Sequence, residues 1–510
     1  MAIYEAIDSP GPRRRLRLRS PVTLEPIGEL ECASEEDVRA ALERARKAQP
    51  AWGELPVDER AVYLQRVSEV LLEKQDLVMQ TVLRETGKAP SEAFSMEVFA
   101  SLDALAYYAK RAPRWLRPEK RRIHGVLGLA KQLRIEYRPL GVVGIIVPWN
   151  GPFVLAMNQA AQALVAGNAV LLKGSEVTPY STRLVGELFE EAGLPEGVLQ
   201  VLMGDGGTGA ALVEAGVDKI SFTGSVATGR RVAEVCGRNL TPVSLELGGK
   251  DAMIVCADAD LDRAAAAALI GSCMNTGQYC CGTERIYAVD AIYEPFVAKV
   301  VERASALRQG ATGEFDVGAI FWDKQLAIIE RHVAEALAKG ARVLVGGRRN
   351  PELSGLYYEP TVLVDVDHSM QIMRDETFGP IVCIQRASDE EEALRLANDS
   401  PYGLSGTVFT KDKARGIELA RQLQTGGVCV NDMTLTYGVP EAPFGGRKES
   451  GVGQVNGRKG LRGYCHEMPI LIDRFGGKLQ GGYPYTTRSL EGAKKFARFY
   501  FGTPLARWLS

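Results

Sequence analysis

Two spacings of apolar residues divide the chain into segments of different character. From residue 34 to about 116, apolar positions recur every three or four residues, the period of an amphipathic helix. Ser34 precedes three carboxylates, a pattern typical of a capped helix start. Between residues 121 and 139 the pattern alternates and is interrupted by Gly125 and Gly128. This change predicts a hairpin that leaves the helical domain.

After residue 140, short β-rich apolar runs alternate with helical stretches. Strands are expected at 142–147, 169–173, 198–203 and 219–222, and helices at 153–166, 180–192, 210–215 and 228–236. This alternation predicts an α/β fold with a parallel, doubly wound sheet. A second α/β region extends from 251 to about 448, and residues 464–472 form a further strand that could join the hairpin. Residues 15–19 alternate arginine with leucine, which predicts an exposed edge strand with its charge on the outer face.

Composition narrows the class of protein. A chain of 510 residues, 46% hydrophobic and 24% charged, is expected to form two or three globular domains. A net charge of -2 argues against nucleic-acid binding. No apolar run reaches the roughly 18 residues of a membrane span, and no secretory signal pattern opens the chain. Nine cysteines and four histidines lack ligand-like spacing, so we expect a reducing, cytoplasmic setting and no metal site.

The candidate chemistry centres on residues 273–285, which contain the adjacent pair Cys280 and Cys281 after a Gly-Gln step. Cysteines of this kind are often small, buried and inert. A thiolate flanked by glycines, where the backbone leaves room for a substrate to approach, is however an accessible nucleophile. Four other segments favour the second interpretation: Pro148-Trp149-Asn150, Leu245-Glu246-Leu247-Gly248-Gly249-Lys250, Glu376-Thr377-Phe378-Gly379-Pro380 and Pro443-Phe444-Gly445-Gly446.

In order and approximate spacing, these segments resemble the signatures of the NAD(P)-dependent aldehyde dehydrogenase superfamily, from about residue 21 to about 472. The resemblance implies a Rossmann-type NAD-binding domain (1–120 and 140–248) and an α/β catalytic domain (249–448). It also implies a small β oligomerisation element that bridges subunits (121–139 and 449–472), and hence a homodimer or homotetramer. Residues 473–510 form a C-terminal extension.

The resemblance also implies a mechanism. By its place in Gly277-Gln278-Tyr279-Cys280, Cys280 rather than Cys281 would add to the aldehyde carbonyl. The addition is needed because hydride leaves a tetrahedral thiohemiacetal more readily than an aldehyde. The side-chain amide of Asn150 and the backbone N–H of Cys280 would hold the oxyanion. Glu246 would then deprotonate the water that hydrolyses the thioester. Relatives that transfer the acyl group to coenzyme A typically lack this base, so its presence favours hydrolysis.

Eight residues are candidates for binding NAD. By resemblance, Lys173 and Glu176 meet the adenosine ribose, although the usual proline between them is Gly174 here. A carboxylate at Glu176 would repel the 2′-phosphate of NADP, which favours NAD. The remaining candidates are those of the phosphate-side loop and of the nicotinamide side: Gly224, Ser225, Gly229, Trp149, Glu376 and Phe378.

The substrate pocket is expected to be apolar. Its candidate residues are Phe153, Asn158, Tyr279, Cys281, Tyr437 and Phe444. At the position of Asn158, relatives that oxidise betaine aldehyde carry tryptophan and those that oxidise succinate semialdehyde carry arginine. A neutral aliphatic or aromatic aldehyde is therefore expected. Two alternatives remain open: an enzyme that acylates coenzyme A, and a catalytically silent structural protein on the same fold.

The extension contains one amphipathic stretch. In residues 489–501 the apolar positions share one side, while Lys494, Lys495 and Arg498 point elsewhere. Three roles fit this pattern: packing on the chain itself or on a neighbouring subunit, peripheral contact with a membrane surface, or a lid over a tunnel for long-chain aldehydes.

Overall fold

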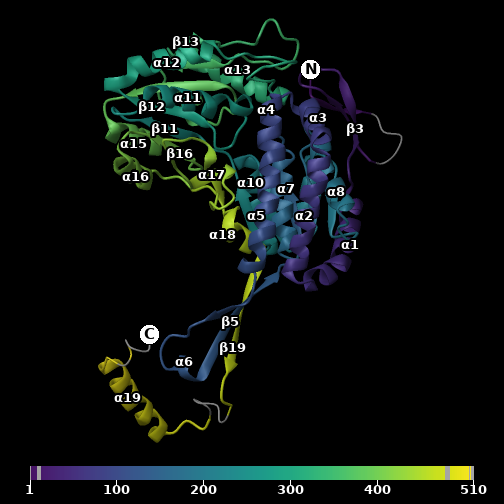
Figure 1. The fold of residues 1–510 in the computed structure, drawn as a ribbon, viewed down its shortest axis with the longest axis vertical. Helices are drawn as coiled ribbons and strands as arrows, with labels where there is room; N and C mark the ends of the chain where they lie inside the picture. The colour runs from purple at the N-terminus through teal and green to yellow at the C-terminus, as the bar shows by residue number, and fades with distance from the viewer. Residues whose placement is uncertain (1, 8–12, 477–482, 505, 507–510) are drawn as a thin grey trace.

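The computed structural model describes residues 2–7, 13–476, 483–504 and 506. Figure 1 shows two sheet-containing units side by side, with a slender arm that extends away from them to the C-terminal helix. None of the described helices is both long enough and apolar enough to span a bilayer.

The first unit is built on a six-stranded sheet in the order β18-β10-β9-β6-β7-β8. Its strands are β6 (Val142–Ile146), β7 (Ala169–Lys173), β8 (Leu199–Leu202), β9 (Lys219–Thr223), β10 (Val243–Glu246) and β18 (Gly451–Val452). Neighbouring strands are parallel, except that β18 runs antiparallel to β10. The predicted parallel sheet is therefore confirmed. Residues 451–452, which we expected in the bridging element, belong instead to this sheet, because β18 pairs with β10.

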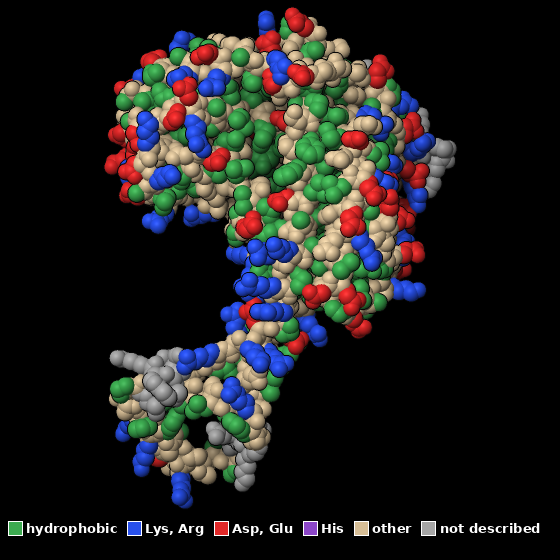
Figure 2. All heavy atoms as spheres, viewed as in Figure 1, with side chains coloured by type: hydrophobic (Ala, Val, Ile, Leu, Met, Phe, Trp, Pro, Cys, Tyr) green, Lys and Arg blue, Asp and Glu red, His purple; other side chains and the backbone are tan. Residues whose placement is uncertain are grey.

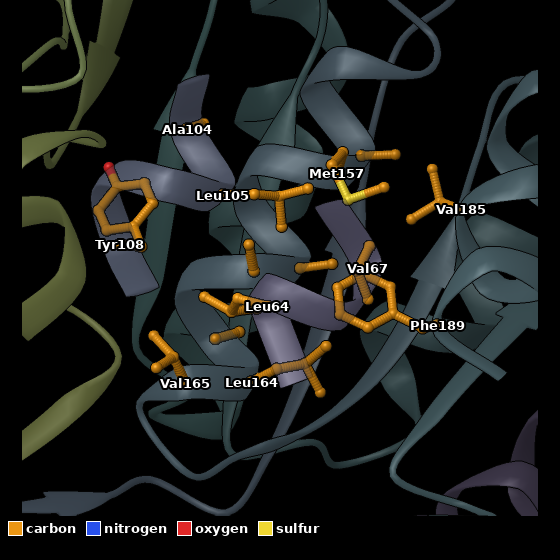
Figure 3. Packing of buried hydrophobic residues seen from close by; sticks show 14 of the residues in the cluster. Leu64, Val67, Ala104, Leu105, Tyr108, Met157, Leu164, Val165, Val185 and Phe189 are labelled. Atoms are coloured by element: carbon orange, nitrogen blue, oxygen red, sulfur yellow. The ribbon is translucent and has the colours of Figure 1, made fainter. Parts of the chain in front are cut away.

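Helices cover both faces of this sheet, which makes it doubly wound. Alternate residues of β6 point to opposite sides, so that Val142 packs with one helical layer and Val143 with the other. The first layer contains α1 (Glu35–Glu54), α9 (Gly206–Glu214) and α10 (Val226–Asn239). The second contains α2 (Val57–Glu73), α5 (Ala100–Trp115), α7 (Val154–Val165) and α8 (Pro179–Glu191), and Figure 3 shows its buried side chains.

Local signals account for several boundaries in this unit. Helix α1 begins after Ser34, whose hydroxyl accepts from the N–H of Asp37 while the Asp37 carboxylate accepts from the N–H of Ser34. This capping box confirms the expected helix start. Helix α3 (Gln75–Thr86) ends at Gly87, which has a left-handed φ of 63°. A short α4 (Pro90–Glu92) and a π-helical turn (Ala93–Phe99) then lead into α5.

The second unit is built on a seven-stranded sheet in the order β13-β14-β15-β12-β11-β16-β17. Its strands are β11 (Asp251–Val255), β12 (Thr283–Val289), β13 (Arg342–Val345), β14 (Thr361–Val364), β15 (Ile381–Ala387), β16 (Gly406–Phe409) and β17 (Cys429–Val430). Only β13 is antiparallel to its neighbour. One face is covered by α11 (Leu261–Cys273) and α12 (Tyr293–Ser305), the other by α13 (Asp323–Ala338), α15 (Glu390–Asn398) and α16 (Lys413–Gln422).

The arm is a three-stranded antiparallel sheet in the order β19-β5-β4. It joins β4 (Glu119–Arg121) and β5 (Lys131–Pro139), with α6 (Leu127–Ala130) between them, to β19 (Cys465–Asp473). The expected hairpin and the expected C-terminal strand therefore pair with each other. Helix α19 (Thr487–Gly502) lies at the far end of the arm (Figure 1). The shorter helices are α14 (Gln371–Arg374), α17 (Leu435–Gly438) and α18 (Gly457–Arg462).

The arginine-rich strand is not at an edge. In the N-terminal sheet, β2 (Arg15–Arg19) is the middle strand between β1 (Tyr4–Ile7) and β3 (Pro26–Glu31), which corrects our expectation. Its leucines are buried, and its arginines reach carboxylates on the flanking strands, as in the pairs Arg15–Glu29 and Arg19–Glu5. Opposite charges across neighbouring strands allow a charged strand to sit at the centre.

Candidate active site

The candidate base and the candidate nucleophile lie on two loops that touch each other. Glu246 is the last residue of β10, and the chain passes from there through Gly248 and Gly249 into β11. Cys280 lies on the loop between α11 and β12. A Cβ atom at Gly249 would stand 2.6 Å from the carbonyl oxygen of Cys280, so glycine lets the two loops touch. The arrangement brings Cys280 beside the segment that carries Glu246.

An unusual backbone leads to the nucleophile. Asn275, Thr276 and Gly277 have φ values of 56°, 56° and 71°, three consecutive residues in the left-handed region. Such conformations cost energy for residues other than glycine and persist only where the surroundings hold them. At Gly277 a side chain is also sterically impossible, since its Cβ would lie 2.0 Å from the carbonyl oxygen of Gly379.

Amide side chains hold this loop against the Asn150 segment. The Asn150 amide donates to the carbonyl of Gln278 at 3.1 Å, and the Asn275 amide donates to the Asn150 carbonyl at 2.9 Å. Gln278 in turn accepts from the N–H of Phe321 at 2.9 Å. An amide nitrogen carries two hydrogens, so Asn150 keeps one N–H for a ligand oxygen. Asn150 is 6% exposed, which makes it a fixed donor next to the cysteine loop.

Glu246 is a buried carboxylate without a hydrogen bond. It is 6% exposed, and neither of its carboxylate oxygens has a partner among the described residues. Burial, and next the negative charge of a thiolate at Cys280, raise its pKa well above the ordinary value. A carboxylate in this condition is a strong base when ionised and has lone pairs free to accept a proton.

The two adjacent cysteines have different environments. Cys280 is partly exposed, whereas Cys281 is buried and donates to the carbonyl of Thr434 at 3.6 Å. Burial, and next its neighbour Cys280, raise the pKa of the Cys281 thiol well above the ordinary value. Only Cys280 therefore combines access with closeness to Asn150 and Glu246.

Four of the six candidate substrate residues gather around Cys280. Cys281 and Phe444 belong to a small apolar cluster with Leu404 and Val455, and Tyr279, Cys280 and Tyr437 pack against it. The rings of Tyr437 and Phe444 meet edge to face, with centroids 5.1 Å apart. This cluster supplies an apolar wall next to the partly exposed sulfur.

The other two candidate substrate residues are placed differently. The amide of Asn158 donates to the Tyr437 hydroxyl at 3.2 Å and to Asn456 at 3.0 Å, so its polar atoms are already engaged. Phe153 has 0% exposure and packs in the helical core of the first unit, outside the cluster around Cys280.

The loop from β9 into α10 is one end of the candidate dinucleotide site. The Ser225 hydroxyl caps α10 by accepting from the N–H of Thr228 at 3.3 Å. A Cβ at Gly229 would lie 2.5 Å from Leu247, so this glycine brings the first turn of α10 against the strand end. A close-packed helix start at the carboxyl end of a parallel strand is where α/β sheets bind phosphates. Gly224 provides the turn between the two elements.

The second end of the candidate dinucleotide site is the loop after β7. The Lys173 ammonium is 3.4 Å from the Glu176 carboxylate, and the hydroxyl of Tyr4 donates to the same carboxylate at 3.3 Å. Burial, and next the charge of Glu176, raise the pKa of Tyr4 to about 12. Tyr4 was not among our candidates, and its distance in sequence from Glu176 explains why. These partners orient Glu176 at the strand end.

The nicotinamide-side candidates form a separate group. Trp149 meets Phe378 edge to face at 5.4 Å, and Phe378 has a left-handed φ of 52°. Its N–H donates to Glu284 at 3.0 Å. Glu376 accepts from the N–H of Gly249 at 3.0 Å, and burial, with a smaller contribution from Glu284, raises its pKa to about 8.

Three buried ionic or polar groups were missed from the sequence. Glu284 accepts from Lys250 and from the N–H of Thr377, and so fixes the Glu376–Phe378 segment. Lys250 and Glu284 lay inside the quoted motifs without an assigned role. The third group, the pair of Lys88 and Glu97, gave no signal beyond charge within a helical pattern.

The residues present fit a bound dinucleotide. The capped start of α10, the buried Lys173 ammonium and the aromatic pair of Trp149 and Phe378 would meet a pyrophosphate, a ribose and a flat ring in turn.

The comparisons place this fold and motif set in a family. The aldehyde dehydrogenase family matches residues 7–469. The 4,4'-diapolycopene aldehyde oxidase of Methylomonas sp. is 41% identical, over 91% of this chain and 87% of its own. A putative succinate-semialdehyde dehydrogenase [NADP(+)] of Mycolicibacterium smegmatis is 42% identical, over 86% and 85%.

A solved structure gives the same result. The aldehyde dehydrogenase of Mycobacterium tuberculosis, determined with NAD+, superposes with a TM-score of 0.87 at 37% identity, over 91% of this chain and 96% of that one. The chain therefore belongs to the aldehyde dehydrogenase family. It has that family's α/β fold and is an oxidoreductase that acts on the aldehyde group with NAD or NADP.

Proposed function

We propose that this enzyme oxidises a neutral, apolar aldehyde to the carboxylic acid with NAD, through a thioester on Cys280 that water hydrolyses with Glu246 as the base. The observation that carries the hydrolytic step is the buried carboxylate of Glu246, without a hydrogen-bond partner among the described residues and close enough to Cys280 for their charges to interact. In this proposal the six-stranded unit holds the dinucleotide, the seven-stranded unit holds the nucleophile, and the arm joins subunits.

The first step is covalent. The Cys280 thiolate forms a bond to the carbonyl carbon, and the electron pair of the C=O bond moves to oxygen. The amide of Asn150 and the N–H of Cys280 donate to this oxyanion, and a donor of this kind contributes about 2.7–4 kcal/mol. The dinucleotide, when bound, supplies a hydride acceptor. Return of that electron pair to carbon re-forms the C=O bond, the C–H bond breaks with loss of hydride, and a thioester remains on Cys280.

The second step removes the acyl group. Glu246 takes a proton from water, the hydroxide adds to the thioester carbon, and the C–S bond breaks. Sulfur leaves as the thiolate, so Cys280 is restored, and the proton on Glu246 returns to solvent. The absence of any hydrogen bond to Glu246 within the described chain supports this role, since its lone pairs are free for water.

The substrate class follows from the wall next to Cys280. Its described members are Cys281, Leu404, Phe444, Val455, Tyr279 and Tyr437, which offer aliphatic and aromatic surface against which an apolar aldehyde can pack. The amide of Asn158 is already bonded to Tyr437 and Asn456. The Methylomonas relative, named a 4,4'-diapolycopene aldehyde oxidase, supports this assignment more than the relatives named for succinate semialdehyde do.

The preference for NAD rests on Glu176. Its carboxylate, oriented by Lys173 and Tyr4, would repel a 2′-phosphate at the ribose. Relatives named for NADP and structures with NAD+ both occur, so the two dinucleotides must be compared directly.

The test is reduced-dinucleotide formation with NAD and NADP across linear aldehydes of increasing length, aromatic aldehydes and charged semialdehydes. We expect NAD and the long or aromatic aldehydes to give the highest kcat/KM. Cys280→Ala should abolish turnover, while Cys465→Ser, a partly exposed thiol on β19, should not. Glu246→Gln should retain the burst of NADH and lose steady turnover. Turnover that requires coenzyme A, or NAD binding without oxidation of any aldehyde, would overturn the proposal.

A further inference from the structure

The end of the arm has a composition unlike the rest of the molecule. Residues 117–139 contain seven lysines and arginines against two carboxylates, and residues 473–510 again contain seven against two, in a chain whose net charge is -2. The family match ends at residue 469, so the extension is a feature of this chain outside that match. We call α6, α19 and the described segments next to them, at the tip of the arm, the distal lobe. The strands β4, β5 and β19 are the part of the arm that we propose joins subunits.

All four carboxylates of these two ranges are already neutralised. Glu119 pairs with Arg462, Glu136 with Arg138, Asp473 with Lys131 and Glu491 with Lys494. Several cations of the lobe have no described carboxylate as a partner: Arg122, Arg474, Arg488, Lys495 and Arg498. The lobe therefore presents an uncompensated positive charge, and Figure 2 shows blue and green side chains over it with little red.

Helix α19 is amphipathic, and only part of its apolar side is covered. At 3.6 residues per turn, its lysines, its arginines and Glu491 share one side, and its leucine and aromatic residues share the other. Tyr500 is the buried residue of the helix and lies against Gly125 in the hairpin. Phe496 stacks on Tyr500, yet it is 50% exposed, and Phe499 is 60% exposed.

Other large apolar side chains of the lobe are exposed as well. They lie on α6, at and just after the end of β19, before α19 and on α19 itself: Leu127, Leu129, Leu471, Phe475, Tyr483, Tyr485, Leu490 and Phe501. Exposed apolar groups at this density mark a binding surface, since scattered single residues are the usual condition. Aromatic rings next to lysine and arginine suit the boundary between lipid headgroups and acyl chains.

We propose that the distal lobe is a membrane-docking surface, which binds the enzyme peripherally to a bilayer that contains anionic lipids. The aromatic and leucine side chains of α19 and α6 enter the headgroup boundary, and the unpaired lysines and arginines meet lipid phosphates. A second copy of this chain is the alternative occupant of the tip, and flotation separates the two, since a tip covered by a partner subunit would bind neither kind of vesicle.

The geometry also argues against a lid over the chain's own active site. Figure 1 places α19 at the opposite end of the molecule from β11 and β12, next to which Cys280 lies. A docked lobe would keep the enzyme at a bilayer, where an apolar aldehyde is concentrated. The docking itself does not depend on catalysis.

The test is flotation of the full-length enzyme with vesicles of phosphatidylcholine alone and of phosphatidylcholine mixed with phosphatidylglycerol. We expect the wild type to float with the anionic vesicles and to stay below with the neutral ones. Raising the salt from about 0.1 M to about 1 M shortens the screening length from about 10 Å to about 3 Å, and should reduce binding at least about tenfold. Cys280→Ala should float as the wild type does, which separates docking from the proposed oxidation.

Two variants localise the surface. Leu490→Asp/Phe499→Asp places charge on both flanks of the exposed side of α19, and should lower binding at least about tenfold while turnover of a water-soluble aldehyde is unchanged. The matched control is Leu240→Asp, at an exposed position (90%) at the end of α10. Flotation that persists in the double variant would overturn the proposal. A wild type that binds neither kind of vesicle would also overturn it. If the double variant in addition dissociates the oligomer in sedimentation velocity, the surface is a subunit interface instead.

Discussion

Lys88 and Glu97 form an ion pair at 2.5 Å in which neither side chain exposes any surface. Its role is to position the Asn150 segment. The second carboxylate oxygen of Glu97 accepts from the N–H groups of Phe153 and Val154 at the start of α7, and the Lys88 ammonium lies 3.4 Å from the Asn150 carbonyl. The pair thus links the candidate oxyanion donor to the first helical unit.

The first prediction concerns this pair. Lys88→Met should destabilise the protein by about 3–5 kcal/mol, because it leaves an uncompensated carboxylate in the interior. Lys88→Met/Glu97→Gln should recover most of that loss, since the glutamine oxygen still accepts from α7. Chemical denaturation of the three proteins measures this. Breaking the half-exposed pair of Arg183 and Glu187 should cost at most about 1 kcal/mol. Equal losses in the single and double variants would refute the explanation.

The second prediction concerns the loop before the nucleophile. Gly277→Ala would force a methyl group to within 2.0 Å of the Gly379 carbonyl, so the loop that carries Cys280 must shift. A displacement of about 1 Å costs about 100-fold in rate, and kcat should fall accordingly. Gly313→Ala is the control, because Gly313 has a similar φ of 75° but no heavy atom within 4 Å of a Cβ. It should cost about 1–2 kcal/mol in stability and leave kcat unchanged. Full activity in Gly277→Ala would show that the contact is not limiting.

The sequence predicted the architecture where the signal was periodic. The apolar runs that form β6, β7 and β9 were recognisable because a strand buried on both faces is continuously apolar. They alternate with stretches of helical period. The helix start at Ser34 was predictable because its capping box depends only on neighbours within three residues. The candidate roles of Glu246, Cys280 and Asn150 came from motif resemblance rather than from periodicity.

What the sequence could not predict depends on partners far along the chain. Strand β2 has the same alternation at an edge as in the middle of a sheet, and only the flanking carboxylates of β1 and β3 decide between the two. A two-residue strand such as β18 has no period at all. The pairing of Lys250 with Glu284, and that of Tyr4 with Glu176, likewise arise only on folding.

The third prediction concerns Glu284. Its carboxylate accepts from Lys250 and from the N–H groups of Thr377 and Phe378, and so holds Phe378 in its left-handed conformation. Glu284→Gln exchanges one acceptor oxygen for a donor, and a lost bond to a charged group costs about 1.5–3 kcal/mol. We expect the KM for NAD to rise about tenfold, equivalent to about 1.4 kcal/mol, with little change in the KM for aldehyde.

The control for this prediction is Glu330→Gln, which breaks an exposed pair with Arg349. It should leave both constants unchanged. A fluorescence titration of dinucleotide binding gives an independent measurement. An unchanged NAD affinity in Glu284→Gln would mean that Phe378 does not need this carboxylate to pack against the ring.

The fourth prediction concerns Glu246 and pH. Burial raises its pKa in the folded chain, so the folded state holds the proton more tightly than the unfolded state does. The stability gained in this way is complete below the ordinary carboxyl pKa and is lost as the pH rises through the raised value. Glu246→Gln has no charge to bury, so its melting temperature should exceed that of the wild type at alkaline pH and match it at acid pH. Hydrolysis of the acyl-enzyme should behave oppositely, rising with pH in the wild type as Glu246 ionises and staying low and flat in Glu246→Gln. Thermal denaturation and single-turnover kinetics over the same pH series measure the two effects. A wild-type hydrolysis rate independent of pH would exclude Glu246 as the base.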